Sequence, residues 1–270
     1  MYNSEKAITQ EKISFLPEVS IQVADSDSEA ELFYSFIKEE RGTRWSDAFN
    51  KAFPELFKKL AGVDDKEGAM KICKEFSEEQ HKIHQEEILK MKLLFEKDWK
   101  LVEAKFLSEL SKHFETDWNP ERAKIVGNVT ILPVFPRNLD DYSFFVGYED
   151  VASMIETAAH EIVHFLWFKK WKEVFPESKR REYESPNLAW RLSEIIVQII
   201  LQCNPEIKKL INPKKWGYAS FKKIKIGDVS MTDHFKKVYE SSVTEGNDFA
   251  TTMKLLWEES KKHEKEISEF

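Results

Sequence analysis

Two histidines four positions apart, with a glutamate directly after the first, occur in the segment TAAHEIVHFLWFKKW (residues 157–171). Positions i and i+4 lie on one face of an α-helix, so His160 and His164 can each direct a ring nitrogen at a common point. A zinc ion about 2.0–2.1 Å from both nitrogens would fit at that point. Glu161 would lie beside the ion, where a carboxylate can hold a water molecule and act as a general base. The spacing therefore predicts a zinc site with its catalytic base.

The surroundings of the motif are mostly apolar, which predicts a largely buried helix. Buried histidines need partners for their ring nitrogens, and one metal ion supplies a partner to both. The alternative is a pair of core histidines bonded to backbone carbonyl groups, with Glu161 on a solvated face. We favour zinc because the spacing is specific and the helix is apolar.

A catalytic zinc site usually has three protein ligands and an open position for water. The longer metzincin motif is excluded, because Trp167 and Lys170 stand where its glycine and third histidine would be. The remaining common solution is a glutamate on a later helix. The chain offers Glu182, Glu184 and Glu194.

Two of these glutamates differ in their sequence context. Glu194 lies in the apolar segment LAWRLSEIIVQIILQ (residues 188–202), where a carboxylate is costly unless its charge is compensated. Glu184 lies in the polar segment KRREYESPN, where a solvated glutamate needs no compensation. This contrast favours Glu194 as the third ligand.

HEIVH followed by a glutamate-bearing helix resembles the gluzincin group of zinc metallopeptidases, which includes thermolysin-like enzymes and zinc aminopeptidases. The resemblance covers about residues 125–200 and implies a zincin-like fold, a Zn²⁺ cofactor and a peptide or protein substrate. The spacing of thermolysin-like enzymes would select Glu184, but four residues later stands Leu188, which cannot accept a hydrogen bond from a ligating histidine. Four residues after Glu194 stands Gln198, whose amide oxygen can. We therefore predict His160, His164 and Glu194 as the ligands.

The resemblance also implies a mechanism. Zinc lowers the pKa of a water molecule and polarises the scissile carbonyl, and Glu161 passes the water's proton to the leaving amine. Related enzymes stabilise the oxyanion with a tyrosine or histidine from a later segment, which implies His234 or Tyr239 in TDHFKKVYE. For His234, a surface position on a charged helix is an equal alternative. An extended peptide would pair with an edge strand, either VTILPVF or YSFFVGY.

Two other functional classes stay open. One is a binding or regulatory protein that keeps structural zinc and cleaves nothing. The other is a zinc hydrolase acting on a non-peptide amide. The glutamate of the motif favours an enzyme, because a non-catalytic protein has no need of the base.

The predicted fold is α+β and mainly helical, with a helical N-terminal region (residues 1–120) and a zincin-like metallopeptidase region (residues 121–270). Residues 1–27 are expected to be a polar lead-in. KIVGNVTILPVF (124–135) and YSFFVGY (142–148) are expected to pair as a hairpin before the motif. Helices are expected at 28–41, 46–62, 64–116 (two, or one continuous helix), 187–203, 230–242 and 246–268.

Composition limits the partners and the compartment. A net charge of -7 opposes the electrostatics of nucleic-acid binding. The N-terminal residues lack an apolar core of the signal-peptide kind, and no apolar run reaches the about 18 residues of a membrane span. Cys73 and Cys203 match no ligand spacing and are expected to be thiols in a reducing compartment. We expect a cytoplasmic protein without nucleic-acid or membrane partners.

The motif HKIH (81–84) is expected on a solvated helix face.

Overall fold

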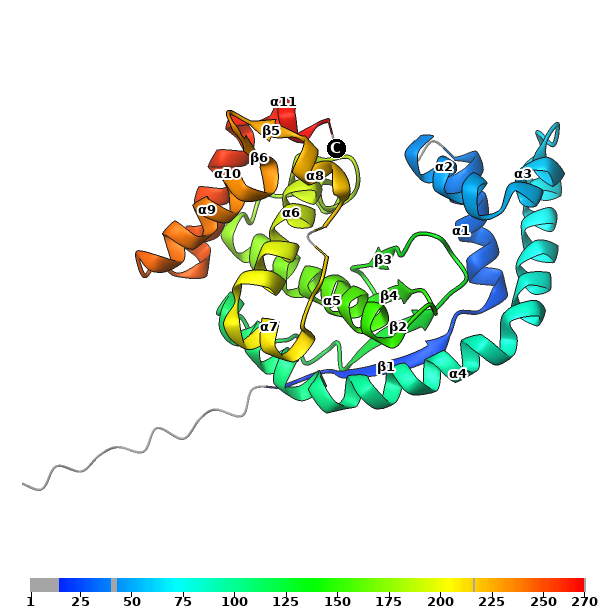
Figure 1. Ribbon diagram of the computed structural model, residues 1–270, viewed down its shortest axis with the longest axis horizontal. Helices are drawn as coiled ribbons and strands as arrows, with labels where there is room; N and C mark the ends of the chain where they lie inside the picture. The colour runs from blue at the N-terminus through cyan, green and yellow to red at the C-terminus, as the bar shows by residue number, and fades with distance from the viewer. Residues whose placement is uncertain (1–14, 40–42, 216, 270) are drawn as a thin grey trace, which may run out of the picture.

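The computed structural model describes residues 15–39, 43–215 and 217–269, and it is mainly helical around a small mixed sheet (Figure 1). The sheet has the order β1-β2-β4-β3, formed by β1 (Glu18–Val23), β2 (Lys124–Val129), β4 (Ser143–Val146) and β3 (Arg137–Asn138). The strands β1, β2 and β4 are mutually parallel, and β3 is antiparallel to β4. The prediction of a mainly helical α+β protein is confirmed.

The predicted hairpin of 124–135 with 142–148 is wrong, because β2 and β4 run parallel. Val126 pairs with Ser143, and Val129 pairs with Val146. The strand β2 ends at Val129, and the chain then passes Pro133 and Pro136, which cannot donate a ladder hydrogen bond. The loop returns the chain to the end of the sheet at which β2 begins, so that β4 can run parallel to β2. On the way, the chain forms β3, a short antiparallel partner of β4.

Neither of the two strands that were expected to hold a peptide therefore lies at the edge of the sheet. VTILPVF leaves the sheet after Val129, and the strand of YSFFVGY lies between β2 and β3. The edge strand on that side is β3, which has only two residues.

A strand was not expected in the predicted polar lead-in, but β1 lies there. Its segment EVSIQV alternates apolar and polar residues, and Val19 and Ile21 are buried. The backbone N–H of Val19 also donates to the buried side chain of Glu103, with an N···O distance of 3.2 Å. Residues 1–14 of that segment lie outside the described residues.

One helix, α4 (Lys66–Phe114), runs for 49 residues without interruption, which selects the continuous alternative for 64–116. Asp65 caps its start by accepting from the N–H of Gly68, and Glu115 ends it in a left-handed conformation with φ of 49°. The helix curves along one side of the molecule (Figure 1). It packs against β1 and α5, so it supports both the sheet and the helix of the motif.

Three short helices contact or lie near the first turns of α4, namely α1 (Ser26–Lys38), α2 (Thr43–Ala52) and α3 (Pro54–Leu60). Pro54 divides the single helix expected at 46–62, because proline is tolerated in the first turn of a helix but not in its interior. The C-terminal helices lie on the opposite side of the sheet in Figure 1.

The second half of the chain carries the remaining elements. They are α5 (Val151–Val174), the 3₁₀ helix η1 (Arg180–Tyr183), α6 (Leu188–Cys203), α7 (Pro205–Ile211), α8 (Ala219–Lys223), β5 (Lys225–Ile226), β6 (Val229–Ser230), α9 (Met231–Thr244), α10 (Phe249–Lys262) and α11 (Glu264–Ile267). The helices expected at 187–203 and 230–242 correspond to α6 and α9, and 246–268 is divided between α10 and α11.

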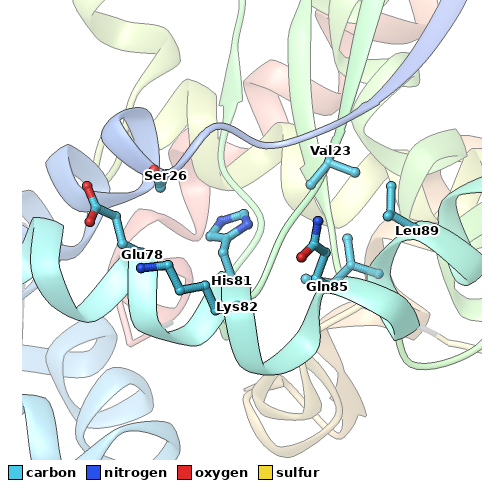
Figure 2. Close-up of a pocket in the computed structure, with 8 residues that line it drawn as sticks. Val23, Ser26, Glu78, His81, Lys82, Gln85 and Leu89 are labelled. Carbon is cyan, nitrogen blue, oxygen red and sulfur yellow. The ribbon is translucent and has the colours of Figure 1, made fainter.

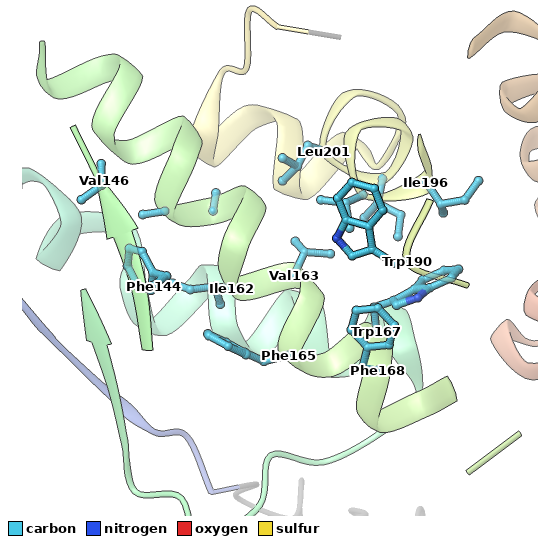
Figure 3. Close-up of a cluster of buried hydrophobic side chains, with 14 of the residues drawn as sticks. Phe144, Val146, Ile162, Val163, Phe165, Trp167, Phe168, Trp190, Ile196 and Leu201 are labelled. Carbon is cyan, nitrogen blue, oxygen red and sulfur yellow. The ribbon is translucent and has the colours of Figure 1, made fainter. Parts of the chain in front are cut away.

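The core between β4, α5 and α6 positions the motif. Figure 3 shows Phe144 and Val146 of β4 near Ile162 of α5, with Trp190 and Ile196 of α6 on another side of that helix. All five side chains are buried. Among the described helices, none combines the length and apolar character that a bilayer crossing would require.

Candidate metal centre

The helix α5 places the HEIVH motif in the interior. Asp150 caps this helix by accepting from the N–H of Ser153 at 2.8 Å. The small residues Ala158 and Ala159 are fully buried just before the motif. Because α5 packs against β4, α4 and α6, the face that carries the two histidines is enclosed.

The two imidazoles and the Glu194 carboxylate converge. The His160 Nε2 atom lies 3.1 Å from His164 Nε2 and 3.2 Å from Glu194 Oε2. His164 Nε2 lies 3.5 Å from Glu194 Oε1. Ligands about 2.0–2.1 Å from a tetrahedral zinc ion are about 3.3–3.4 Å apart. The three observed separations scatter around that value, and the donor set is one that zinc accepts.

Glu194 and Glu184 have opposite environments. The side chain of Glu194 is 3% exposed and lies against both histidines. That of Glu184 is 57% exposed and pairs with Arg180 at 2.6 Å. The structure therefore brings Glu194 to the motif and leaves Glu184 on the surface.

The second nitrogen of His160 contacts Gln198, the residue expected to orient it. His160 Nδ1 lies 2.7 Å from Gln198 Nε2, while the buried Gln198 Oε1 has no hydrogen-bond partner among the described residues. A half-turn of the amide brings its oxygen to Nδ1, where it accepts the Nδ1 proton and leaves Nε2 free to bind a metal. His164 Nδ1 is buried without such a partner in the described part of the chain, so only one histidine is oriented in this way.

Arg137 is the residue that sequence reasoning missed. Its Nη1 donates to Glu194 Oε1 at 3.0 Å and to Glu161 Oε2 at 3.2 Å. Its guanidinium also lies 6.0 Å from the centre of the Phe168 ring. The sequence signal was weak, because PRNLDD has turn composition and Arg137 is 24 residues from Glu161 and 57 from Glu194.

The pKa values of the two carboxylates are shifted in opposite directions. Burial alone would raise the pKa of Glu194, but Arg137 and the two histidines hold it below its usual range. Burial raises the pKa of Glu161 and outweighs the opposing effects of Arg137 and His160. Glu194 therefore has the stronger cationic environment.

The two imidazoles also differ. Burial would lower the pKa of His160, but the hydrogen bond with Glu194 and the charge of Glu161 raise it. Burial, with a contribution from Arg137, lowers the pKa of His164 well below its usual value. Burial therefore favours the neutral form of His164.

The two predicted oxyanion stabilisers have other partners. His234 Nε2 lies 2.9 Å from Glu259 Oε1, and the Tyr239 hydroxyl lies 3.3 Å from His113 Nε2. Burial raises the pKa of Tyr239 and lowers that of His113 to about 4. The described polar contacts thus join neither residue to Glu161, whose charged neighbour is Arg137.

The motif HKIH is only partly solvated, because Lys82 and Ile83 are exposed whereas His81 turns to the interior. His81 Nε2 is 2.6 Å from the carboxylate of Glu29, which is fully buried and also accepts from the Ile131 N–H. The hydrogen bond with Glu29 raises the pKa of His81. Figure 2 shows His81 beside a pocket that Val23 and Ser26 also line. This pair joins α1 to α4, so the expectation of a solvated face is wrong for His81.

Comparison of the chain with protein-family models, curated proteins and solved structures finds no match. Its function is therefore inferred from its own residues. The resemblance to gluzincins depends on HEIVH and the glutamate of the following helix.

Proposed function

We propose that the chain is a zinc-dependent metallopeptidase of the gluzincin type, with a zincin-like catalytic region. His160, His164 and Glu194 would hold the zinc ion, and Glu161 would be the general base. The observation that carries the proposal is the convergence of both imidazoles and Glu194 within 3.1–3.5 Å, with Glu161 in the same cluster.

Each residue of the cluster has a distinct task in this proposal. A bound zinc ion supplies a Lewis acid for the scissile carbonyl and acidifies a water molecule. Glu161 Oε1 lies 4.0 Å from His160 Nε2, so the carboxylate is beside the ligands and can accept a proton there. Gln198 keeps the Nε2 atom of His160 turned toward the cluster.

The edge strand beside the cluster favours a peptide substrate. A sheet edge offers backbone donors and acceptors with which an extended peptide can pair. Arg137 belongs to this strand, β3, and its side chain contacts Glu161. A peptide paired with β3 would therefore run close to the proposed base, whereas a small non-peptide amide would not need this edge.

A cytoplasmic location forms part of the proposal. Cys73 and Cys203 are both free thiols in the structure. Unpaired cysteines are typical of a reducing compartment.

Glu161→Gln tests the catalytic role. The amide keeps the shape of the side chain and leaves the three ligands in place, so zinc content should change little. Loss of a general base should lower the cleavage rate by at least about 10²–10⁴-fold. The measurement is mass-spectrometric detection of products from a mixed peptide library, with chelated wild type and zinc-restored wild type as controls.

Three results of that screen are informative. Cleavage by zinc-loaded wild type alone supports the proposal. Equal cleavage by both proteins assigns the activity to another base or to a contaminant. Absence of cleavage by fully zinc-loaded wild type favours a non-catalytic zinc protein.

Glu194→Gln and Glu184→Gln form a matched pair for the ligand assignment. Replacement of Glu194 should weaken zinc binding by more than the about 10–100-fold that is usual for an outer-shell partner. Replacement of Glu184 should leave zinc affinity unchanged, because that side chain is exposed and paired with Arg180. The measurement is competition titration against a chelator, and the reverse order would transfer the ligand role to Glu184.

A further inference from the structure

A second cluster of potential metal ligands lies among the C-terminal helices. His234 is in the first turns of α9, Glu259 is in α10, and His263 is the residue between α10 and α11. The ligand atoms of these three residues lie within 4.8 Å of one another. None of them is in the HEIVH motif or on α6.

The geometry resembles that of the first cluster. Glu259 Oε1 lies 2.9 Å from His234 Nε2 and 3.3 Å from His263 Nε2. The two imidazole rings are 4.9 Å apart and inclined by 76°, so they do not stack. Ligands on a tetrahedral metal ion are about 3.3–3.4 Å apart, and the two separations from Glu259 Oε1 lie at or a few tenths of an ångström below that value.

One oxygen of the Glu259 carboxylate faces the two histidines, and the other oxygen binds a lysine. Lys262 Nζ binds Glu259 Oε2 at 2.9 Å, whereas Oε1 faces both imidazoles. Glu266 Oε1 lies 3.8 Å from the other nitrogen of His263, where an acceptor could orient a ligating ring. The side chains of His234, Glu259 and His263 are 18–24% exposed, so an ion and a completing water molecule can enter.

We propose that His234, Glu259 and His263 form a second binding site for a divalent transition metal ion. Two imidazoles and one carboxylate suit Zn²⁺ and Ni²⁺ better than Mg²⁺ or Ca²⁺, which prefer oxygen ligands. This site is independent of the proposed peptidase function and does not require it.

The position of the site indicates a structural role. A metal ion there would join α9 to the junction of α10 and α11. The helix α11 packs on α6, and Arg191 of α6 donates to the carbonyl oxygen of Ile267 at 3.1 Å. Because α6 also carries Glu194, the second ion would stabilise the C-terminal support of the first cluster.

The test is zinc titration of the full chain, with competition against a chelator and elemental analysis of the bound metal. Wild type should bind two equivalents. His263→Gln should weaken binding of one equivalent at least about 10-fold, the lower limit for removing even an outer-shell partner. His84→Gln is the matched control, because that histidine lies on α4 against Tyr148 and should leave both equivalents.

The Glu194→Gln variant separates the two sites. It should lose the equivalent at the motif, and its remaining equivalent should disappear on addition of His263→Gln. If the motif binds no zinc, wild type takes one equivalent that His263→Gln weakens, and the second site stands without the first. Wild-type zinc affinity for every equivalent in His263→Gln overturns the proposal.

A second measurement applies if His263→Gln does not fold. Zinc should then raise the Tm of the Glu194→Gln protein, because that variant retains only the second site. Absence of any zinc-dependent Tm rise in that protein overturns the proposal.

Discussion

Arg137→Met in metal-free protein tests whether one guanidinium holds the two buried carboxylates of the cluster. Arg137 donates to Glu194 at 3.0 Å and to Glu161 at 3.2 Å, and the side chains of these residues are 3–11% exposed. Each hydrogen bond to a charged group contributes about 1.5–3 kcal/mol, so the two together contribute about 3–6 kcal/mol. Breaking a buried ion pair by removing one partner costs about 3–5 kcal/mol, which agrees.

A loss of about 3–5 kcal/mol corresponds to a Tm decrease of roughly 6–20 °C, at about 2–4 °C per kcal/mol for a chain of this size class. Urea unfolding of chelated protein measures the free energy, and a thermal scan measures Tm. Methionine keeps most of the side-chain volume, so the loss reports mainly on charge. Added zinc should restore part of the stability, because a cation then compensates the same carboxylates.

Arg180→Met is the matched control, because Arg180 also has two carboxylate partners. It binds Asp140 at 3.0 Å and Glu184 at 2.6 Å, but these carboxylates are 72% and 57% exposed. Exposed pairs contribute about 0–1 kcal/mol. A loss for Arg137→Met within about 1 kcal/mol of that for Arg180→Met would refute the view that buried Glu161 and Glu194 depend on Arg137.

Two further predictions concern the fold. A Cβ atom at Gly127 would lie 2.7 Å from the ring of Phe144 and 2.9 Å from Ile21, so Gly127→Ala should reduce the free energy of unfolding by about 1–3 kcal/mol. Urea unfolding checks this, and a loss under about 0.5 kcal/mol would contradict tight packing of Phe144 and Ile21 over Gly127. The raised pKa of His81 means that its pair with Glu29 stabilises the fold fully below the unfolded-state pKa of about 6.5, and that this contribution is lost as pH rises through the folded-state value. The stability difference between wild type and His81→Gln should therefore shrink from pH about 5.5 to about 8.5, and it should show no such dependence in a Glu29→Gln background.

The proximity of His160, Glu161 and His164 could be predicted because helical geometry fixes the relation of residues one and four positions apart. Glu194 could be placed beside them from two signs, its apolar helix, in which a carboxylate needs a cationic or hydrogen-bonding partner, and Gln198 four residues later. No local rule linked Arg137 to either glutamate. Its approach depends on the path of the chain from β2 through β3, which periodicity does not encode.

The sheet was predicted less well for a similar reason. Alternation of apolar and polar residues indicates a strand but has the same period in parallel and antiparallel pairs. The partner of β1 is β2. Glu18 pairs with Lys124, and the four helices α1 to α4 lie between these two residues in the sequence. The prolines at 133 and 136 were the available sign that 124–135 is not one strand of a hairpin.

The position of Arg137 links the sheet edge to the proposed chemistry. Its backbone is in β3 and pairs with Phe144, while its side chain spans to α5 and α6. A peptide that adds to β3 would therefore pair with the same short strand whose arginine orients Glu161. Displacement of β3 would change the counterion of Glu161 and of Glu194 together, because one Nη1 atom serves both carboxylates. If Glu161 is the proposed base, substrate pairing at the edge and its proton acceptance are coupled through this one side chain.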